Sequence, residues 1–200
     1  MISFQCPKCH KSFQVPDSYA GKKARCKACR EELRIPQAQV PEISAAPKPS
    51  IRVRRLIADA ESMSKTFANH PMIRIESTEG DPPEKYHICF NIKGLERDSR
   101  GRVLERSSHR VEVQLGADYP RLPPVCRMLT PIFHPNINDA YICIGDHWTA
   151  GERLIDLITR IAEMIAYQAY NIRSPLDGEA AMWADLNAQR LPIDPRPISF

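Results

Sequence analysis

The chain contains 200 residues, of which 42% are hydrophobic and 26% charged, with a formal net charge of +4, enough for one well-buried core and a small appended domain. No apolar run approaches the roughly 18 to 20 residues that span a bilayer, so we expect no membrane-spanning segment. Met1–Cys6 has neither the basic start nor the apolar core of a signal peptide, so we expect a cytoplasmic protein.

Four of the seven cysteines lie in the first thirty residues, as two Cys-x2-Cys pairs. Each pair can bend two thiolates around one ion, and two pairs complete a tetrahedron, so the spacing predicts a zinc site. No position is left for water, so the zinc should be structural and replace the apolar core that residues 1–35 are too few to build. The predicted ligands are Cys6, Cys9, Cys26 and Cys29, and disulfides or free thiols are the alternative.

The sequence around these cysteines resembles a short zinc ribbon found at the N-termini of many bacterial proteins, through Phe4–Cys9, Val15–Pro16 and Ala20–Cys26. The resemblance implies a bacterial source. Residues 1–50 carry nine Lys or Arg and four Asp or Glu, an excess that would suit a phosphate-binding face. Four thiolates on one Zn²⁺ carry a net −2 charge that offsets much of this excess. We therefore expect no nucleic-acid partner and keep a nucleic-acid-binding zinc protein as an alternative.

Residues 36–50 contain four prolines and no aromatic residue, which predicts a semi-extended linker before a larger domain at 51–200. Past the linker, apolar residues recur at helical spacing from Val53 to Phe67, until Pro71 disfavours further helix. The opposite face of this helix is basic and is either solvated or a docking surface. Its residues are Arg52, Arg54, Arg55 and Lys65.

Four short segments with alternating apolar residues follow, and their spacing predicts an antiparallel meander. The segments are 72–76, 86–92, 111–115 and 125–129. Cys89 and Cys126 fall inside the second and fourth segments and should be small buried hydrophobes. Residues 94–109 form either an extended hairpin built on Val103 and Leu104 or a mobile loop, and the sequence leaves both open.

Two more helices are predicted in the last quarter of the chain. Thr149–Glu152 has the pattern of a capping box, which would open a core helix with one apolar face from Leu154 to Ile165. Ser174-Pro175 has the pattern of an N-cap followed by proline at the first helical position, which predicts a final helix. The proline-rich tail from Leu191 to Pro197 cannot continue that helix.

The stretch Phe133–Cys143 contains His-Pro-Asn and ends on a cysteine. It resembles the motif of ubiquitin-conjugating enzymes (E2), in which an asparagine precedes the cysteine that carries the modifier as a thioester. Three further landmarks resemble that family's and come in the same order: Tyr119–Pro124, Trp148 and Asn171–Leu176. The resemblance covers roughly residues 51 to 190. It implies an α+β fold with an N-terminal helix, a four-stranded antiparallel meander and C-terminal helices, here preceded by the zinc ribbon.

The resemblance also assigns roles to single residues. Cys143 would accept ubiquitin or a ubiquitin-like protein from an E1-like activating enzyme, as a thioester with a good sulfur leaving group. Asn136 would donate an amide N–H to the oxyanion that forms when a lysine of a target protein attacks. His134 mainly shapes the turn in this family, a role we prefer to that of a base. Ser174 stands where many members have an acid that orients the lysine, and Asp146 is the residue that would partly replace it.

Two departures from the family concern its partners. Arg121 replaces an aromatic residue that often helps to hold RING-type ligases, and Trp148–Gly151 lacks the usual Ser-Pro-Ala loop. An orthodox RING ligase is therefore doubtful, and a ligase-free bacterial pathway fits better. The helix at 51–67 would dock on the E1 in this family. We expect a transferase of the E2 (aminoacyltransferase) type; the alternatives are an inactive E2 variant that only holds a modifier, the nucleic-acid-binding zinc protein and, more remotely, a thiol hydrolase.

Overall fold

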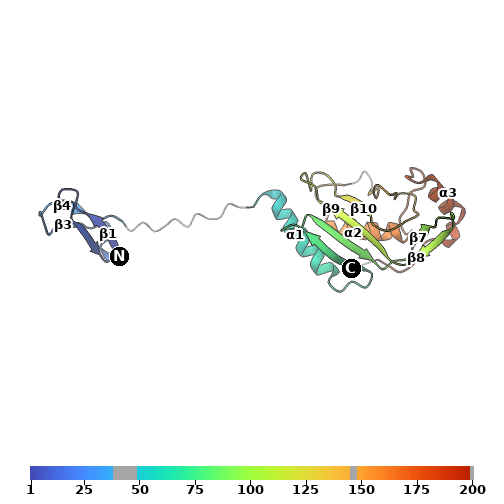
Figure 1. The fold of residues 1–200 in the computed structure, drawn as a ribbon, viewed down its shortest axis with the longest axis horizontal. Helices are drawn as coiled ribbons and strands as arrows, with labels where there is room; N and C mark the ends of the chain where they lie inside the picture. The colour runs from blue at the N-terminus through green and yellow to red at the C-terminus, as the bar shows by residue number, and fades with distance from the viewer. Residues whose placement is uncertain (38–48, 145–147, 199–200) are drawn as a thin grey trace. The chain divides into compact units, whose positions relative to one another are not determined.

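The computed structural model describes residues 1–37, 49–144 and 148–198. The chain forms two compact units, Met1–Lys48 and Pro49–Phe200 (Figure 1). Within the described part of the chain, no helix combines the length and the apolar character needed to cross a membrane.

Two antiparallel β-hairpins build the N-terminal unit. The first pairs β1 (Ile2–Gln5) with β2 (Ser12–Val15), and the second pairs β3 (Lys23–Arg25) with β4 (Glu32–Arg34). A short 3-10 helix, η1 (Asp17–Tyr19), lies between the hairpins in the sequence. The buried apolar cluster of this unit is small, as expected for so short a segment, and two of its five members are cysteines: Ile2, Cys6, Cys26, Leu33 and Ile35.

The same turn occurs in both hairpins because the same cysteine spacing occurs twice. The N–H of His10 donates to the carbonyl oxygen of Cys6, and the N–H of Arg30 donates to that of Cys26, each at 2.9 Å. His10 and Arg30 both adopt a positive φ, of 55° and 60°. Each Cys-x2-Cys pair therefore sits in an equivalent tight turn at the end of a hairpin.

A four-stranded antiparallel sheet forms the centre of the C-terminal unit, in the order β10-β9-β6-β5. Its strands are β5 (Ile73–Glu79), β6 (Lys85–Phe90), β9 (His109–Gln114) and β10 (Val125–Met128). Each of the first three pairs with the next of these strands along the chain, which confirms the predicted meander. Cys89 and Cys126 are buried within it, at 3% and 2% exposure, as predicted.

Residues 94–109 contain a hairpin, which decides between the two alternatives that the sequence left open. It pairs β7 (Gly94–Arg97) with β8 (Val103–Arg106). Gly94 leaves no room for a side chain, because a Cβ there would lie 2.8 Å from both His109 Nε2 and the carbonyl oxygen of Ile165. This hairpin is therefore packed closely against β9 of the sheet and against the helix that contains Ile165.

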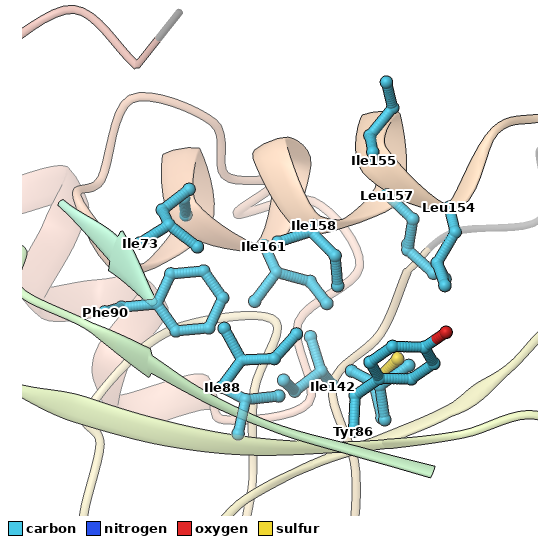
Figure 2. Packing of buried hydrophobic residues seen from close by; sticks show 14 of the residues in the cluster. Ile73, Tyr86, Ile88, Phe90, Ile142, Leu154, Ile155, Leu157, Ile158 and Ile161 are labelled. Atoms are coloured by element: carbon cyan, nitrogen blue, oxygen red, sulfur yellow. The ribbon is translucent and has the colours of Figure 1, made fainter. Parts of the chain in front are cut away.

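Among the described residues of the C-terminal unit are three α-helices, with a short 3-10 turn after the last. They are α1 (Ile51–Phe67), α2 (Leu154–Ile165), α3 (Gly178–Leu186) and the turn η2 (Ala188–Arg190). In Figure 2, Ile158 and Ile161 of α2 point toward Ile88 and Phe90 on the sheet, and Leu157 lies on the same helix nearer to Leu154. Leu157, Ile158, Ile161, Ile88 and Phe90 make up one part of this core. All five are fully buried, and each such side chain stabilises the fold by about 1.5–3 kcal/mol relative to its exposed state.

The predicted starts of α2 and α3 are wrong, although the helices exist. Helix α2 begins at Leu154 after Arg153, without a side-chain cap, and Thr149–Glu152 is a turn closed by the backbone. Helix α3 is capped by Asp177, whose side chain accepts from the N–H of Ala180 at 3.0 Å, and Ser174 lies three residues too early. Tertiary contacts are the reason: the segments that precede α2 and α3 are both hydrogen-bonded to other parts of the domain.

Candidate functional site

Residues 136–143 form a tight hairpin that ends on the candidate cysteine. Ile137 and Ile142 pair across it in an antiparallel bridge, and the N–H of Cys143 donates to the carbonyl oxygen of Asn136 at 2.9 Å. At its tip, Asn138 Oδ1 accepts from two backbone N–H groups at 2.9 and 3.0 Å, a turn that asparagine favours. The hairpin therefore places Asn136 and Cys143 opposite each other.

His134 is completely buried below this hairpin. Its Nδ1 accepts from the N–H of Asn136 at 3.1 Å, and its ring lies 4.7 Å from that of Tyr167, centroid to centroid. Burial lowers the pKa of His134 to about 3, opposed only in part by a backbone interaction with Ala169. The imidazole is therefore neutral at physiological pH and shielded from solvent, an arrangement that suits a turn-forming residue better than a base.

Asn136 joins the hairpin to the loop before α3. Its Nδ2 donates to the carbonyl oxygen of Asn171 at 2.8 Å, and its Oδ1 accepts from the N–H of the same residue at 2.7 Å. The carbonyl oxygen of Pro135 also accepts from the N–H groups of Leu176 (2.7 Å) and Asp177 (3.1 Å). These contacts hold residues 171–177 against the His-Pro-Asn turn, which prevents a helix from starting at residue 174.

Cys143 is partly exposed and not in a disulfide. Within the described ranges, no hydrogen bond or ion pair involves its sulfur. Ser174 is exposed, in the loop that packs on the hairpin, and has no acidic group to offer. Asp146, the predicted substitute, lies outside the described residues. The structure thus brings Cys143, Asn136, His134 and the 171–177 loop together around one hairpin.

The inserted hairpin of β7 and β8 also contacts this region, through Phe133. The N–H of Phe133 donates to the carbonyl oxygen of Leu95 in β7 at 2.7 Å, and the hydroxyl of Tyr167 donates to the carbonyl oxygen of Phe133 at 2.6 Å. Leu95, Phe133 and Tyr167 form a separate buried cluster with Ala180 and Ala184 of α3. Sequence reasoning gave Tyr167 no role, because it lies just past the apolar pattern of α2.

Arg55 of α1 binds the segment that leads into α2. Its guanidinium donates to the carbonyl oxygens of Ala150 (2.6 Å) and Glu152, to the hydroxyl of Tyr119 (3.1 Å) and to the carboxylate of Asp59 (2.7 Å). Tyr119 in turn donates to Asp59 at 2.5 Å, and burial raises the pKa of the tyrosine well above its usual range. This network fixes the 150–152 segment and explains why α2 starts without a capping box.

The predicted basic face of α1 is therefore wrong for two of its four members. Arg52, like Arg55, turns toward the domain and donates to the carbonyl oxygens of Leu115 and Gly116, at 3.3 and 3.0 Å. Arg54 and Lys65 are exposed. A basic docking surface on α1 would have to rest on those two residues.

The four N-terminal cysteines lie together, with every pair of sulfurs within 4.8 Å. The Sγ atoms of Cys6 and Cys29 are 3.6 Å apart, and those of Cys9 and Cys26 are 3.7 Å apart. Zn–S bonds of ~2.3 Å in a tetrahedron place sulfurs about 3.8 Å apart, whereas a disulfide needs ~2.05 Å. The donor set and spacing fit a tetrahedral zinc ion.

Comparison with known proteins identifies the family of the domain that carries Cys143. The model of the ubiquitin-conjugating enzyme family matches residues 61–191. The chain belongs to the ubiquitin-conjugating enzyme family. The predicted family and its α+β fold are thereby confirmed, with the helices and antiparallel sheet described above.

Curated ubiquitin-conjugating enzymes from several organisms are similar to part of the chain. Ubiquitin conjugating enzyme E2 B from Dictyostelium discoideum is 29% identical over 93 residues, which are 44% of this chain and 62% of that protein. Ubiquitin-conjugating enzyme E2 S from Drosophila grimshawi is 29% identical over 95 residues (44% and 46%). Probable ubiquitin-conjugating enzyme E2 L460 from Acanthamoeba polyphaga mimivirus is 32% identical over 96 residues (46% and 57%). The chain thus spans between 46% and 62% of the length of these relatives.

The match to the ubiquitin-conjugating enzyme family contains the hairpin at 136–143 and the loop at 171–177, and it begins within α1. The cysteine cluster lies outside the matched range. The N-terminal unit is therefore an addition to the ubiquitin-conjugating domain, and the argument for its metal rests on its own geometry.

Proposed function

We propose that this chain is an E2 carrier whose Cys143 receives ubiquitin or a ubiquitin-like protein from an E1-like activating enzyme. The observation that carries the proposal is the hairpin that presents a partly exposed cysteine opposite Asn136 inside a domain of this family. The Cys143 thiolate attacks the carbonyl carbon of the E1-bound thioester, and the E1 thiolate leaves. A lysine amine or other nucleophile of a target protein then attacks the new thioester, loses a proton, and displaces the Cys143 thiolate as the amide forms.

Asn136 is the proposed donor to the oxyanion of that second step. An amide nitrogen carries two N–H groups, and one of them donates to the carbonyl oxygen of Asn171. The other remains for the developing charge, and the contacts with Asn171 keep the side chain in one orientation, so that little reorganisation is needed.

The proton of the attacking lysine has no acceptor at residue 174, since serine is not a base at neutral pH. We assign that role to Asp146, with solvent as the other acceptor. An inactive variant that only holds a modifier is the second candidate, and the observation in its favour is the exposed Ser174 at this position. Arg121, exposed on its turn, does not supply the aromatic group of an orthodox RING-ligase surface.

For the N-terminal unit we propose a structural zinc ion held by Cys6, Cys9, Cys26 and Cys29, in a ribbon of the bacterial type. When bound, the ion cross-links the two hairpins in place of a larger apolar core. We propose a cytoplasmic location, where thiols stay reduced and can bind the metal. We propose no nucleic-acid or membrane partner.

The carrier proposal is tested by loading the full-length protein with ubiquitin, an E1 and ATP, followed by gel analysis without reductant. Chemically activated ubiquitin C-terminal thioester serves as a second donor that needs no E1. We expect an adduct that thiols cleave, and Cys143→Ser should give a thiol-resistant ester or none. Cys89→Ser, which alters a buried cysteine, should load normally. A normal adduct in Cys143→Ala would overturn the assignment, and failure with both donors would favour the inactive variant.

A further inference from the structure

The two hairpins of the N-terminal unit enclose an open cavity of about 110 Å³. Its wall is mostly apolar, with Leu33 and Ile35 buried and four further residues partly exposed: Phe4, Phe13, Val15 and Ala24. Buried Cys26, one of the proposed zinc ligands, also lines it. The rings of Phe4 and Phe13, paired across β1 and β2, have centroids 5.8 Å apart. Because an apolar cavity of roughly 150 Å³ can hold a benzene molecule, this one has room for a single apolar side chain.

The rim of this cavity is positively charged. Arg25 and Lys27 also line it, both are exposed, and neither forms an ion pair with any residue that the structure describes. Lys8, by contrast, is neutralised by Glu31 at 2.8 Å. Residues 1–37 hold eight Lys or Arg against three Asp or Glu, so basic charge remains even beside a zinc–thiolate centre of net −2. A complementary ligand therefore joins one apolar group to nearby negative charges.

We propose that this cavity binds a short acidic segment of a partner protein, with one aliphatic side chain such as leucine inside it and carboxylates beside Arg25 and Lys27. A protein segment fits better than a nucleic acid, because the wall is built from aliphatic and phenyl groups. The polar edges of a nucleobase would lose their hydrogen bonds to water there without replacement. The proposal goes beyond the carrier function, since the site makes no use of Cys143.

The test uses the full-length, zinc-loaded protein and a fluorescein-labelled peptide, Asp-Glu-Asp-Leu-Glu-Asp-Glu, with binding measured by fluorescence anisotropy. Replacing the central leucine by alanine should weaken binding about tenfold, the effect of withdrawing one buried aliphatic side chain. A peptide with lysine flanks should not bind. In an NMR titration with the peptide, changes in backbone amide chemical shifts should be confined to residues that line the cavity.

Two variants probe the cavity and its rim separately. Ala24→Leu should fill the cavity and weaken binding of the leucine peptide at least tenfold, while binding of the alanine peptide changes little. Arg25→Glu with Lys27→Glu should abolish binding, whereas Lys11→Glu with Arg34→Glu, an equal change of net charge at exposed sites outside the cavity, should cost no more than about threefold. Zinc content must equal that of the wild type in each variant compared.

Three outcomes would overturn the proposal. Equal affinity for the leucine and alanine peptides would show that only the charges of the peptide contribute to binding. Equal effects of the two charge reversals would show that the net charge of the unit determines binding and that Arg25 and Lys27 make no specific contact with the peptide. Tighter binding of oligo-dT of roughly 16 nucleotides than of the leucine peptide, lost in Phe13→Ala, would assign the same face to single-stranded nucleic acid.

Discussion

The side chain of Asn136 and the backbone of Asn171 exchange two hydrogen bonds, of 2.8 and 2.7 Å. Asn136→Ala should therefore remove both the tie to the loop and the proposed oxyanion donor. We expect loading of Cys143 to persist and discharge to free lysine to slow by about 10²-fold, as for the loss of one oxyanion donor. Single-turnover discharge of the purified thioester, chased with lysine, measures this.

The matched control for this change is Asn171→Ala. The contact with Asn136 uses only the backbone of Asn171, so this variant should keep it and discharge within about threefold of the wild type. If Asn136→Ala loses loading and discharge equally, the residue builds the hairpin and has no separate part in the second step.

Arg55 and Arg54 are neighbours in α1 with opposite surroundings, which gives a second prediction. The Arg55 side chain is 18% exposed and pairs with Asp59, which is 7% exposed, whereas Arg54 is exposed. Arg55→Ala would leave the buried Asp59 carboxylate without its charged partner, so we expect a loss of about 3 kcal/mol in the free energy of unfolding. Arg54→Ala should change it by less than about 0.5 kcal/mol. Urea unfolding of both variants checks this, and equal effects would contradict the buried network.

The elements that the sequence predicts well are those set by local periodicity. Helix α1 and the four-stranded meander follow from apolar spacing within each segment. The family resemblance likewise rests on local motifs around Cys143. These features need no knowledge of distant contacts.

The features that sequence reasoning missed depend on contacts between distant segments. Arg55 looks like a surface residue until the carbonyl groups of 150–152 are placed beside it. Ser174-Pro175 looks like a helix start, but the backbone of Leu176 and Asp177 is bound to the carbonyl oxygen of Pro135. The hydrogen bonds of Asn136 to Asn171 also join distant parts of the chain. The motif therefore identifies Asn136 but does not reveal the contacts that orient its side chain.

The cap of α3 gives a third prediction that follows from this correction. Asp177→Ala removes the side chain that accepts from the N–H of Ala180 and should cost about 1 kcal/mol. Ser174→Ala, at the position that the sequence favoured, should change the free energy of unfolding by less than about 0.5 kcal/mol. Denaturant titration distinguishes the two variants. A larger loss of unfolding free energy for Ser174→Ala than for Asp177→Ala would show that Ser174 caps the helix.

Two buried histidines predict acid sensitivity of the C-terminal unit. Burial lowers the pKa of His134 to about 3 and that of His109 to about 4, from an ordinary value near 6.5. The unfolded state therefore binds more protons than the folded state below pH 6.5, and stability falls as the pH falls, by up to about 1.4 kcal/mol per pH unit for each histidine. Urea unfolding between pH 7.5 and 5 measures the slope, and His109→Gln should reduce it. A flat profile above pH 5 would contradict the burial of neutral imidazoles.

Zinc removal gives the last prediction, because the cysteine cluster and the large core belong to different units. Metal analysis should find one zinc per chain, which Cys9→Ser should lose and Cys89→Ser should keep. Chelation should unfold the two hairpins, whose small cluster cannot stabilise them alone. A truncated chain that begins at Pro49 has no zinc ligand to lose, so calorimetry should give one cooperative transition at the same temperature with and without chelator. Loss of that transition on truncation would mean that the large domain needs the ribbon to fold, and disulfides in freshly purified protein would exclude the metal.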